Sequence, residues 1–401
     1  MTTSLFAQVA QAPADPILGL TEAFNADKNP AKVNLGVGVY QDENGKVPVL
    51  RVVREAERLW YEKEETKSYI PIDGVPAYNK LVQQLVLGGG SPVIEAGRAV
   101  TVQTLGGTGA LRVGADFLKR FFPDAEVVLS SPSWENHRAI FEAAGFTVGS
   151  YPYYSPETHG VDFDAMLGAL KGLKAGTVVL LHASCHNPTG VDLSRDQWAK
   201  VLEVCREAAL VPFLDFAYQG FAEDPEADAF AVRLFAESGL QCVIANSFSK
   251  SLSLYRERVG GLTFVTADAD EAKRVLSQVK RVIRTNYSSP ASHGGQVVAT
   301  VLGDAGLRAQ WLDELAEMRD RILAMRSLMV RTLRGMGVDR DFGFIERQRG
   351  MFSFSGLDVD TVRKLRSEKG LYIVDSGRIC VAAMNTKNMG YICESIAAAL
   401  K

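Results

Sequence analysis

Apolar residues along the middle of the 401-residue chain follow two alternating patterns. Short apolar runs bounded by polar or turn residues indicate buried strands, and apolar positions at helical spacing over longer stretches indicate helices. Strands are expected at residues 99–104, 127–130, 177–181, 211–214, 242–245 and 261–266, and helices at residues 109–121, 135–144, 195–208 and 270–282. This alternation predicts an α/β fold in which helices sandwich a mostly parallel sheet.

The flanking segments predict a second, smaller α+β unit. Residues 33–40, which alternate like a strand but contain two glycines, would belong to this unit, whereas the helical spacing at residues 52–63 falls in the larger one. A long amphipathic pattern at residues 311–334 predicts a helix that bridges the two units. Residues 342–401 alternate short strands and helices.

These patterns give a provisional domain division. The small, polar N-terminal stretch has weak periodicity, so we expect an arm with little structure of its own. The expected parts are an arm at residues 1–14, a small domain at residues 15–46 plus 318–401, and a large cofactor-binding domain at residues 47–317.

Composition narrows the class of protein. The chain is 47% hydrophobic with a net charge of −3, and its charges are dispersed, so we expect no nucleic-acid partner. It has no apolar run long enough for a membrane span and no pattern of a secretory signal, which predicts a cytoplasmic protein without a membrane partner. Its five cysteines lack CxxC spacing, so reduced thiols are expected.

Residues suited to binding or catalysis follow five of the expected strands. In chain order they are Gly106, Gly107 and Thr108; Trp134 and His137; His186 and Asn187; Asp215 and Tyr218; and a loop that contains Lys250. Ligands bind beyond the carboxyl ends of strands in open parallel sheets. These five groups are therefore predicted to converge on one site.

The loop after residues 242–245 carries Ser247, Ser249, Lys250 and Arg258. The hydroxyls and the guanidinium suit a phosphorylated carbonyl compound, which the neutral lysine amine could attack to form a Schiff base. Taken alone, the loop also fits an exposed lysine beside a helix-capping serine.

Two other motifs have both a binding and a structural interpretation. The run from Gly106 to Thr108 leads from a strand into a helix, where backbone N–H groups favour an anion, although a tight turn has the same composition. Without GxGxxG or GK[ST], a single phosphate group fits better than a nucleotide. Gly38 suits either a close ligand approach or a glycine bulge.

Two features of the sequence raise the questions of buried charge and of metal binding. Asp215 ends an apolar strand and therefore needs a cationic partner, for which a protonated pyridine nitrogen would serve. His182 and His186 are four residues apart, but Pro188 and the preceding strand deny them a shared helix face, and no carboxylate completes a site. We therefore expect no metal.

The segment SFSKSLSLYRERVGG, residues 247–261, resembles the lysine signature of the class I aminotransferases, pyridoxal phosphate enzymes of fold type I. From DPILGL to GRICVAAMNTKNM, nearly the whole chain resembles the bacterial-type aspartate and aromatic amino acid aminotransferases, with several segments closer to the aromatic (tyrosine) subgroup. Arg256 departs from the small or polar residue expected in this signature.

The resemblance implies roles for the converging residues. Lys250 would hold pyridoxal phosphate as a Schiff base and move the substrate proton, and Asp215 would pair with the ring nitrogen. Tyr218 and Asn187 would hydrogen-bond the ring oxygen, and Trp134 would stack on the ring. His137 and His182 would support Asp215. The predicted phosphate and loop contacts are Gly107, Thr108, Ser247, Ser249 and Arg258.

The resemblance further implies a homodimer with shared active sites. Tyr69 would reach the cofactor phosphate of the neighbouring subunit, and Arg284 would pair there with a substrate's side-chain carboxylate. Arg378 would bind the substrate α-carboxylate, next to Gly38. The N-terminal arm would lie on the partner.

The implied reaction moves the amino group of an aromatic or dicarboxylic L-amino acid to 2-oxoglutarate by a ping-pong mechanism. Remaining alternatives are a strict aspartate aminotransferase, a pyridoxal phosphate β-lyase or decarboxylase, and a non-catalytic ligand-sensing protein.

Overall fold

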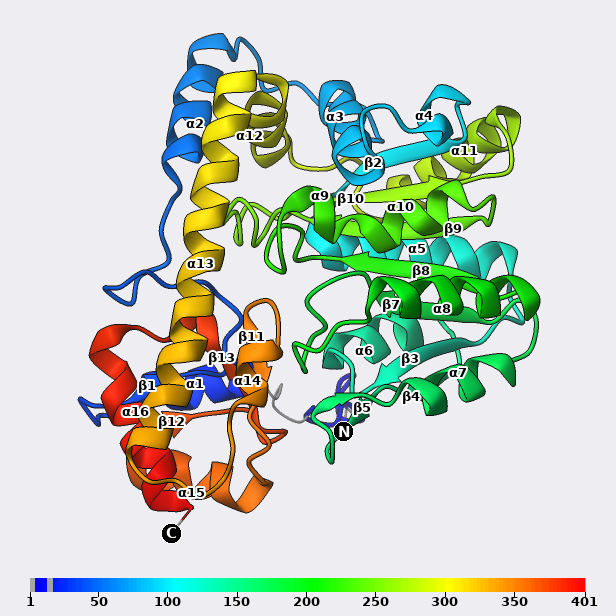
Figure 1. Cartoon of the computed structure of the whole chain (residues 1–401). Helices are drawn as coiled ribbons and strands as arrows, with labels where there is room; N and C mark the ends of the chain where they lie inside the picture. The colour runs from blue at the N-terminus through cyan, green and yellow to red at the C-terminus, as the bar shows by residue number, and fades with distance from the viewer. Residues whose placement is uncertain (1–3, 13–16, 401) are drawn as a thin grey trace.

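The computed structural model describes residues 4–12 and 17–400. Its centre is a seven-stranded sheet (Figure 1). In spatial order the strands are β2 (Ala99–Leu105), β10 (Val259–Val265), β9 (Cys242–Ser247), β8 (Val211–Phe216), β7 (Val178–His182), β3 (Val127–Ser131) and β4 (Val148–Pro152). β10 is antiparallel to both neighbours, and the other pairings are parallel. The predicted α/β fold is confirmed.

Helices cover both faces of this sheet because its strands are apolar on both sides. On β8, Phe213 packs into one core and Leu214 into the other, as expected when successive side chains point to opposite faces. One face carries α5 (Gly106–Phe121), α6 (Glu135–Ala143) and α11 (Ala269–Asn286), and the other carries α3 (Pro76–Leu87), α7 (Phe163–Lys171), α8 (Arg195–Glu207) and α10 (Phe230–Glu237). Gly114 of α5 is essential to this packing, since a Cβ there would lie 2.6 Å from the Phe213 ring.

The reversed direction of β10 follows from its short connection. Residues 248–258 join β9 to β10 without an intervening helix, and a parallel crossover needs a longer segment. The amino end of β10 therefore lies at the edge where β9 ends.

A second unit is built around one long helix. α13 (Ala305–Gly335) has 31 residues, and Figure 1 shows it running from the top of the molecule to its base. Its upper part packs against α12 (Ser292–Gly303) and α2 (Arg51–Lys63). Around its lower part lie α1 (Leu18–Ala26), α14 (Phe344–Arg347), α15 (Val359–Lys369), α16 (Thr386–Ala399), and the strand pairs β1 (Val33–Asn34) with β12 (Leu371–Tyr372) and β11 (Phe352–Phe354) with β13 (Arg378–Cys380).

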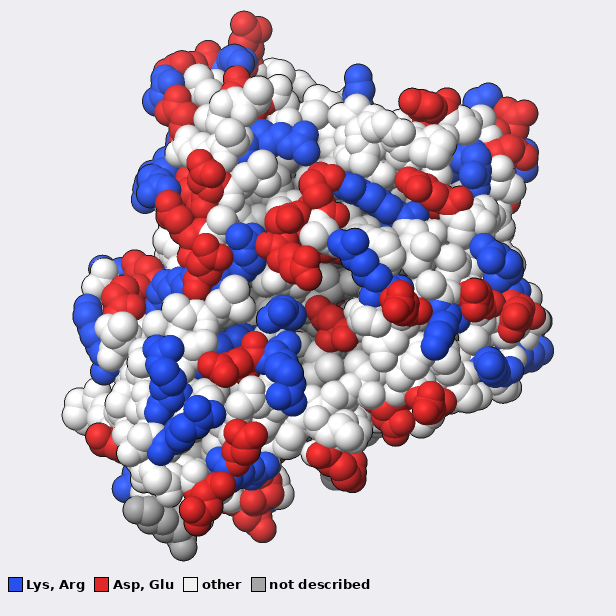
Figure 2. All heavy atoms as spheres, in the orientation of Figure 1, with Lys and Arg blue, Asp and Glu red and all other residues white. Residues whose placement is uncertain are grey.

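Short elements complete the described chain. They are α4 (Pro92–Glu95), β5 (Tyr154–Ser155), β6 (Gly160–Val161), α9 (Pro225–Asp228) and the 3₁₀ turn η1 (Val381–Ala383). Among the described residues, none of the helices is both long and apolar enough to cross a membrane. Positive and negative side chains are interspersed on the face shown in Figure 2, as the dispersed charges in the sequence indicate.

The strand expected at residues 33–40 is wrong beyond Asn34. The two residues that follow bind elsewhere: the Leu35 carbonyl accepts from Cys380 N–H, and the Gly36 carbonyl accepts from the Arg378 guanidinium. These carbonyls are therefore not available to extend a β-ladder. The helix expected at residues 109–121 also begins earlier, at Gly106.

The domain division stays a prediction, as does the placement of the N-terminal arm on a partner. Of the arm, residues 1–3, 13 and 14 lie outside the described residues. Leu5, Phe6 and Val9 have exposed fractions of 86%, 72% and 74%. These apolar side chains are available for contact with another surface.

Candidate active site

The predicted site residues gather at one edge of the central sheet. Asp215 lies near the carboxyl end of β8, and Lys250 follows the carboxyl end of β9. Arg258 immediately precedes β10, whose antiparallel direction brings its amino end to the same edge. The sheet topology thus brings a carboxylate, an amine and a guanidinium together.

Lys250 lies among aromatic rings in a largely buried position. Its Nζ lies 5.6 Å from the Tyr218 ring centroid and 5.7 Å from that of Tyr255. Burial, and then the charge of Arg258, lowers its pKa to about 8, although Asp215 opposes this shift. A substantial fraction of the amine is therefore neutral near pH 8, as a nucleophile or proton acceptor requires.

Asp215 is held by a chain of polar side chains, of which His137 and His182 are buried and Ser133 is half-buried. His137 Nε2 lies 2.7 Å from Asp215 Oδ2, and Ser133 Oγ bridges His137 Nδ1 at 3.0 Å and His182 Nε2 at 3.1 Å. Burial alone would raise the pKa of Asp215, but the hydrogen bond from His137 and the nearby charge of Lys250 help to outweigh burial and lower that pKa. Asp215 is therefore kept as a carboxylate.

The two histidines considered as metal ligands are engaged in other contacts. Burial lowers the pKa of His182 to about 3, so its imidazole is neutral. Both ring nitrogens of His186 are used, by Ser130 Oγ at 2.9 Å and Thr189 Oγ1 at 2.8 Å. No group of three potential metal ligands suited to an ion is found within residues 4–12 and 17–400.

A cradle for an anion forms where α5 begins. The first N–H groups of a helix lack intrahelical partners, and Gly107 and Thr108 lie in this first turn. A Cβ at Gly106 would lie 2.7 Å from Arg258 Nη2, so the guanidinium lies directly against the turn. A Cβ at Gly107 would lie 3.2 Å from Ser247 Cβ. The structure thus brings the predicted phosphate contacts together.

Arg378 forms a second cationic centre, whose charge, like that of Arg258, acts on Lys250. Its side chain is only 1% exposed; Nη2 donates to Gly36 O at 2.6 Å, and Nη1 donates to Asn187 Oδ1 at 3.2 Å. Its buried Nε has no hydrogen-bond partner among the described residues. The guanidinium lies 4.3 Å from the centroid of the Phe352 ring. An unpartnered donor on a buried guanidinium suits a carboxylate ligand.

The remaining predicted residues divide into two groups. Trp134 precedes α6 and lies edge-on to His137, with ring centroids 5.1 Å apart, and the Ser249 N–H donates to Ser247 Oγ at 3.2 Å. Both therefore join the site. Tyr69 and Arg284 do not: Tyr69 is 96% exposed, and the exposed Arg284 donates to Ser288 Oγ.

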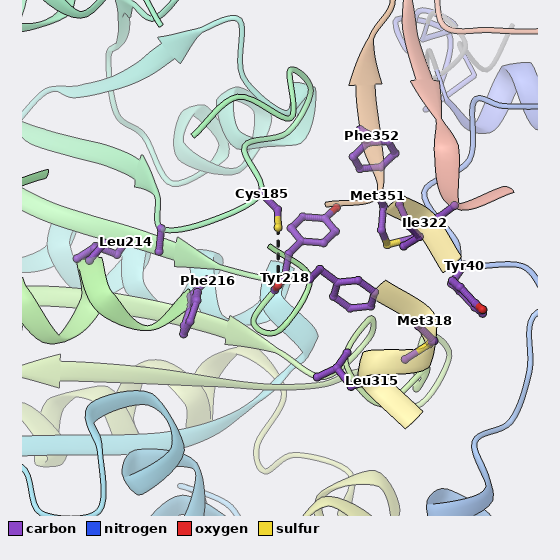
Figure 3. Packing of buried hydrophobic residues seen from close by; sticks show 14 of the residues in the cluster. Tyr40, Cys185, Leu214, Phe216, Tyr218, Leu315, Met318, Ile322, Met351 and Phe352 are labelled. Atoms are coloured by element: carbon purple, nitrogen blue, oxygen red, sulfur yellow. Dashed lines mark hydrogen bonds between the residues drawn. The ribbon is translucent and has the colours of Figure 1, made fainter. Parts of the chain in front are cut away.

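Gly38 is close to an aromatic side chain. A Cβ at this position would lie 2.6 Å from the Phe352 ring, so that side chain requires the glycine. Figure 3 shows Phe352 near Tyr218, and their ring centroids are 6.1 Å apart.

Sequence reasoning missed Phe352, Ser133 and Tyr255, whose hydroxyl accepts from Tyr40 N–H at 2.8 Å. Phe352 lies in a short apolar run that resembles ordinary core. Ser133 lies two residues before α6, where a serine is typical of a helix start.

The opposite edge of the sheet has a different character. A pocket of about 520 Å³ opens there between the ends of α5, α11 and the strands, with mostly apolar walls. Val211, Cys242 and Phe264 contribute to its lining, together with Arg274. None of the predicted site residues lines it.

The fold agrees with comparisons to known proteins. The sequence model of the family "aminotransferase class I and II" matches residues 30–396, and the chain belongs to that family. The resemblance inferred from the lysine signature is confirmed, and the chain is an aminotransferase.

Individual relatives match along the whole chain. It is 57% identical to an aspartate aminotransferase of Pseudomonas aeruginosa, over 98% of this chain and 99% of the relative. It is 60% identical to an aromatic-amino-acid aminotransferase of Burkholderia pseudomallei covalently bound to pyridoxal phosphate, with a TM-score of 0.97 and 100% of both chains covered. A Psychrobacter aromatic amino acid aminotransferase cocrystallised with aspartic acid is 46% identical, with a TM-score of 0.97 and coverage of 99% of this chain and 100% of that one.

Proposed function

We propose that this protein is a pyridoxal phosphate-dependent aminotransferase that accepts both dicarboxylic and aromatic L-amino acids. The observation that carries the proposal is the buried Lys250 amine, with a pKa lowered to about 8, in the electrostatic environment of Arg258 and Asp215. The name of the Burkholderia relative, covalently bound to pyridoxal phosphate, supports the same cofactor.

The residues fit this cofactor on two observations. Arg258, Ser247 and the first turn of α5 form a cradle that one phosphate group would occupy. Asp215 binds His137 through Oδ2, while Oδ1 forms no hydrogen bond within the described residues and can receive a ring N–H. Lys250 would hold the aldehyde carbon covalently, with Tyr218, Asn187 and Trp134 around the ring.

When bound, the cofactor would supply an electron sink for the negative charge that develops on the substrate Cα. Asp215 would keep the ring nitrogen protonated, because the His137 contact stabilises the carboxylate form. Lys250, once released by the substrate amine, would take the Cα proton and return it as a general acid. Arg378 would orient the α-carboxylate through its free Nε.

The substrate range rests on relatives of two kinds. An aspartate aminotransferase and an aromatic-amino-acid aminotransferase are 57% and 60% identical to this chain. The Psychrobacter aromatic enzyme was cocrystallised with aspartic acid. We take 2-oxoglutarate as the acceptor in a ping-pong cycle.

The exposed positions of Tyr69 and Arg284 support a homodimer with shared sites, in which each acts in the partner's site. Mixing Lys250→Ala and Arg284→Ala subunits tests this arrangement, because a hybrid dimer would keep one fully intact site. Activity in the mixture above that of either variant is expected, and no gain contradicts shared sites. We place the enzyme in the cytoplasm, where its described cysteines, all unpaired, would stay reduced.

The test of the reaction is a single-turnover absorbance measurement with the purified holoenzyme. Aspartate and phenylalanine should each bleach the cofactor band and yield the matching 2-oxo acid, and added 2-oxoglutarate should restore the band. Release of ammonia or carbon dioxide without oxo-acid consumption would instead indicate a lyase or decarboxylase. A response to aspartate alone would indicate a strict aspartate aminotransferase.

A further inference from the structure

Arg326 is a buried cation that none of the roles above uses. It lies within α13 and is 1% exposed. No carboxylate lies within ion-pair distance of it in the described chain, and burial lowers its pKa to about 10, so it stays charged at neutral pH. Burying a charge without a counter-ion is costly unless the charge is well hydrogen-bonded.

The guanidinium is held by oxygens of one short segment. Nη2 donates to Gly350 O and Phe352 O, both at 2.7 Å, and Nη1 donates to Ile345 O at 3.2 Å and to Ser353 Oγ. These acceptors lie on both sides of Met351 in the sequence, and Figure 3 shows Met351 next to Phe352. The rigid fork of an arginine therefore fixes the path of residues 345–353 against α13.

This segment carries the ring that packs on the proposed carboxylate-binding arginine. β11 begins at Phe352 and pairs with β13, with Phe354 opposite Arg378. The Phe352 ring centroid lies 4.3 Å from the Arg378 guanidinium, and the same ring fills the space beside Gly38. A shift of the segment would move a wall of the Arg378 pocket.

The segment also contacts the loop that bears Asn187. Arg349 N–H donates to Gly190 O at 2.6 Å, and a Cβ at Gly190 would lie 2.6 Å from Phe352 O. Asn187 in turn accepts from Arg378 Nη1. Arg326 therefore holds a segment that affects two neighbours of Arg378. Phe352 belongs to this segment, and the loop of Asn187 contacts it.

We propose that Arg326 is a positioning residue of the substrate pocket: by anchoring residues 345–353 to α13, it holds Phe352 and the Asn187 loop in the places that aim Arg378 at the substrate α-carboxylate. This inference rests on the proposed function, since it assigns no separate activity to Arg326. It deepens that proposal by linking the bridging helix to substrate affinity.

The test compares Arg326→Lys with the wild-type holoenzyme. Lysine keeps the charge but offers a point donor instead of a fork, so it cannot hold all these acceptors. We expect KM for aspartate to rise by about tenfold, with a smaller fall in kcat, because a misplacement of about 1 Å can have effects of this size or larger. Affinity for succinate, measured by calorimetry, should weaken by a similar factor, while the cofactor absorbance band stays unchanged.

Met329→Ala is the matched control for a purely structural effect. Met329 is buried three residues further along the same helix, where its main-chain carbonyl accepts from Cys393 Sγ at 3.9 Å. It should lower Tm without changing KM or succinate affinity. Equal increases in KM for both variants at matched loss of Tm would overturn the inference, as would an unchanged KM in Arg326→Lys.

A second variant, Phe352→Leu, keeps the test decisive if Arg326→Lys does not fold. It should reproduce the rise in KM and the weaker succinate binding, and an unchanged KM would overturn the proposal. The succinate titration also separates the two proposals. If the wild type binds succinate but does not transaminate, and the variants lose that binding, the proposed function fails while the positioning role stands.

Discussion

The two edges of the central sheet are built from the same strands but have opposite chemistry. β8 begins with Val211 at an apolar pocket and ends near Asp215, which binds His137 at 2.7 Å. β9 likewise begins with Cys242 at that pocket and ends with Ser247 beside the first turn of α5. At the amino edge the ends of these strands line an apolar pocket, whereas at the carboxyl edge they present polar groups that suit a ligand.

In this sheet, residues that contribute mainly to stability lie at the amino edge, and residues suited to ligand binding lie at the carboxyl edge. Loops and helix starts cluster at the carboxyl ends of parallel strands, so unpaired N–H groups and polar side chains meet there. The amino ends meet the last turns of the preceding helices and are covered by apolar side chains. Substitutions at the two edges should therefore affect different measurements.

The largest expected effect is at the carboxyl edge, from Lys250→Ala. Removing the amine would take away both the proposed covalent attachment and the proposed proton carrier, so kcat should fall by about four orders of magnitude. The variant should stay folded, since the change also removes an amine that burial makes unfavourable to charge. Steady-state kinetics and a melting curve check both points, and a variant that keeps most of its activity would contradict the role.

At the amino edge, Phe264→Ala should affect stability instead. Phe264 is 5% exposed and packs against Phe117 at 4.8 Å between ring centroids. The cavity left behind should lower the free energy of unfolding by about 3–5 kcal/mol, measured by urea denaturation. KM and kcat of the folded fraction should match the wild type. A clear change in KM of the folded fraction would show that the amino edge also affects substrate binding, and would contradict the contrast between the two edges.

Asp215→Asn tests the carboxyl end of β8, the strand whose first residue, Val211, lines the apolar pocket at the other edge. The amide keeps the shape but loses the negative charge that would face a ring N–H. We expect kcat to fall by about 10²–10³, the usual range for losing one preorganised electrostatic contact. Single-turnover absorbance with aspartate measures the step directly, and an undiminished rate would exclude the proposed pairing.

The smallest expected effect is a pH dependence of stability in the cofactor-free protein. The pKa of Lys250 is lowered from 10.5 to about 8, mainly by burial. Between these values the unfolded chain binds more protons than the folded one, so the contribution of Lys250 to stability rises with pH across this window and is least favourable below it. Urea denaturation of wild type and Lys250→Met across the window should show the wild type gaining stability relative to the variant. A constant difference would contradict the shift.

Much of the central sheet could be predicted from the sequence because its strands are short, continuous apolar runs. The runs at β7, β8 and β9 and the helix pattern of α8 agree with the structure within one or two residues. The carboxyl-edge site was predictable because Asp215 interrupts one apolar run and Lys250 follows another. Burying a charge at such positions is costly unless a partner compensates for it.

Other features depend on contacts between distant segments, which no local pattern encodes. The strand expected at residues 33–40 ends early because Arg378 and Cys380 take its carbonyl groups. Ser133 joins His137 to His182 only once the start of α6 lies against the end of β7. In the sequence, Arg326 has the pattern of a charged residue on an amphipathic helix. Its buried role depends on acceptors in residues 345–353, which are distant along the chain. These residues become visible only in three dimensions.

The most direct test of the account is borohydride reduction of the holoenzyme followed by peptide mass mapping. We expect the peptide containing Lys250 to gain the mass of the reduced cofactor and every other lysine to remain unmodified. An unmodified Lys250, or a label on a different lysine, would contradict the central claim.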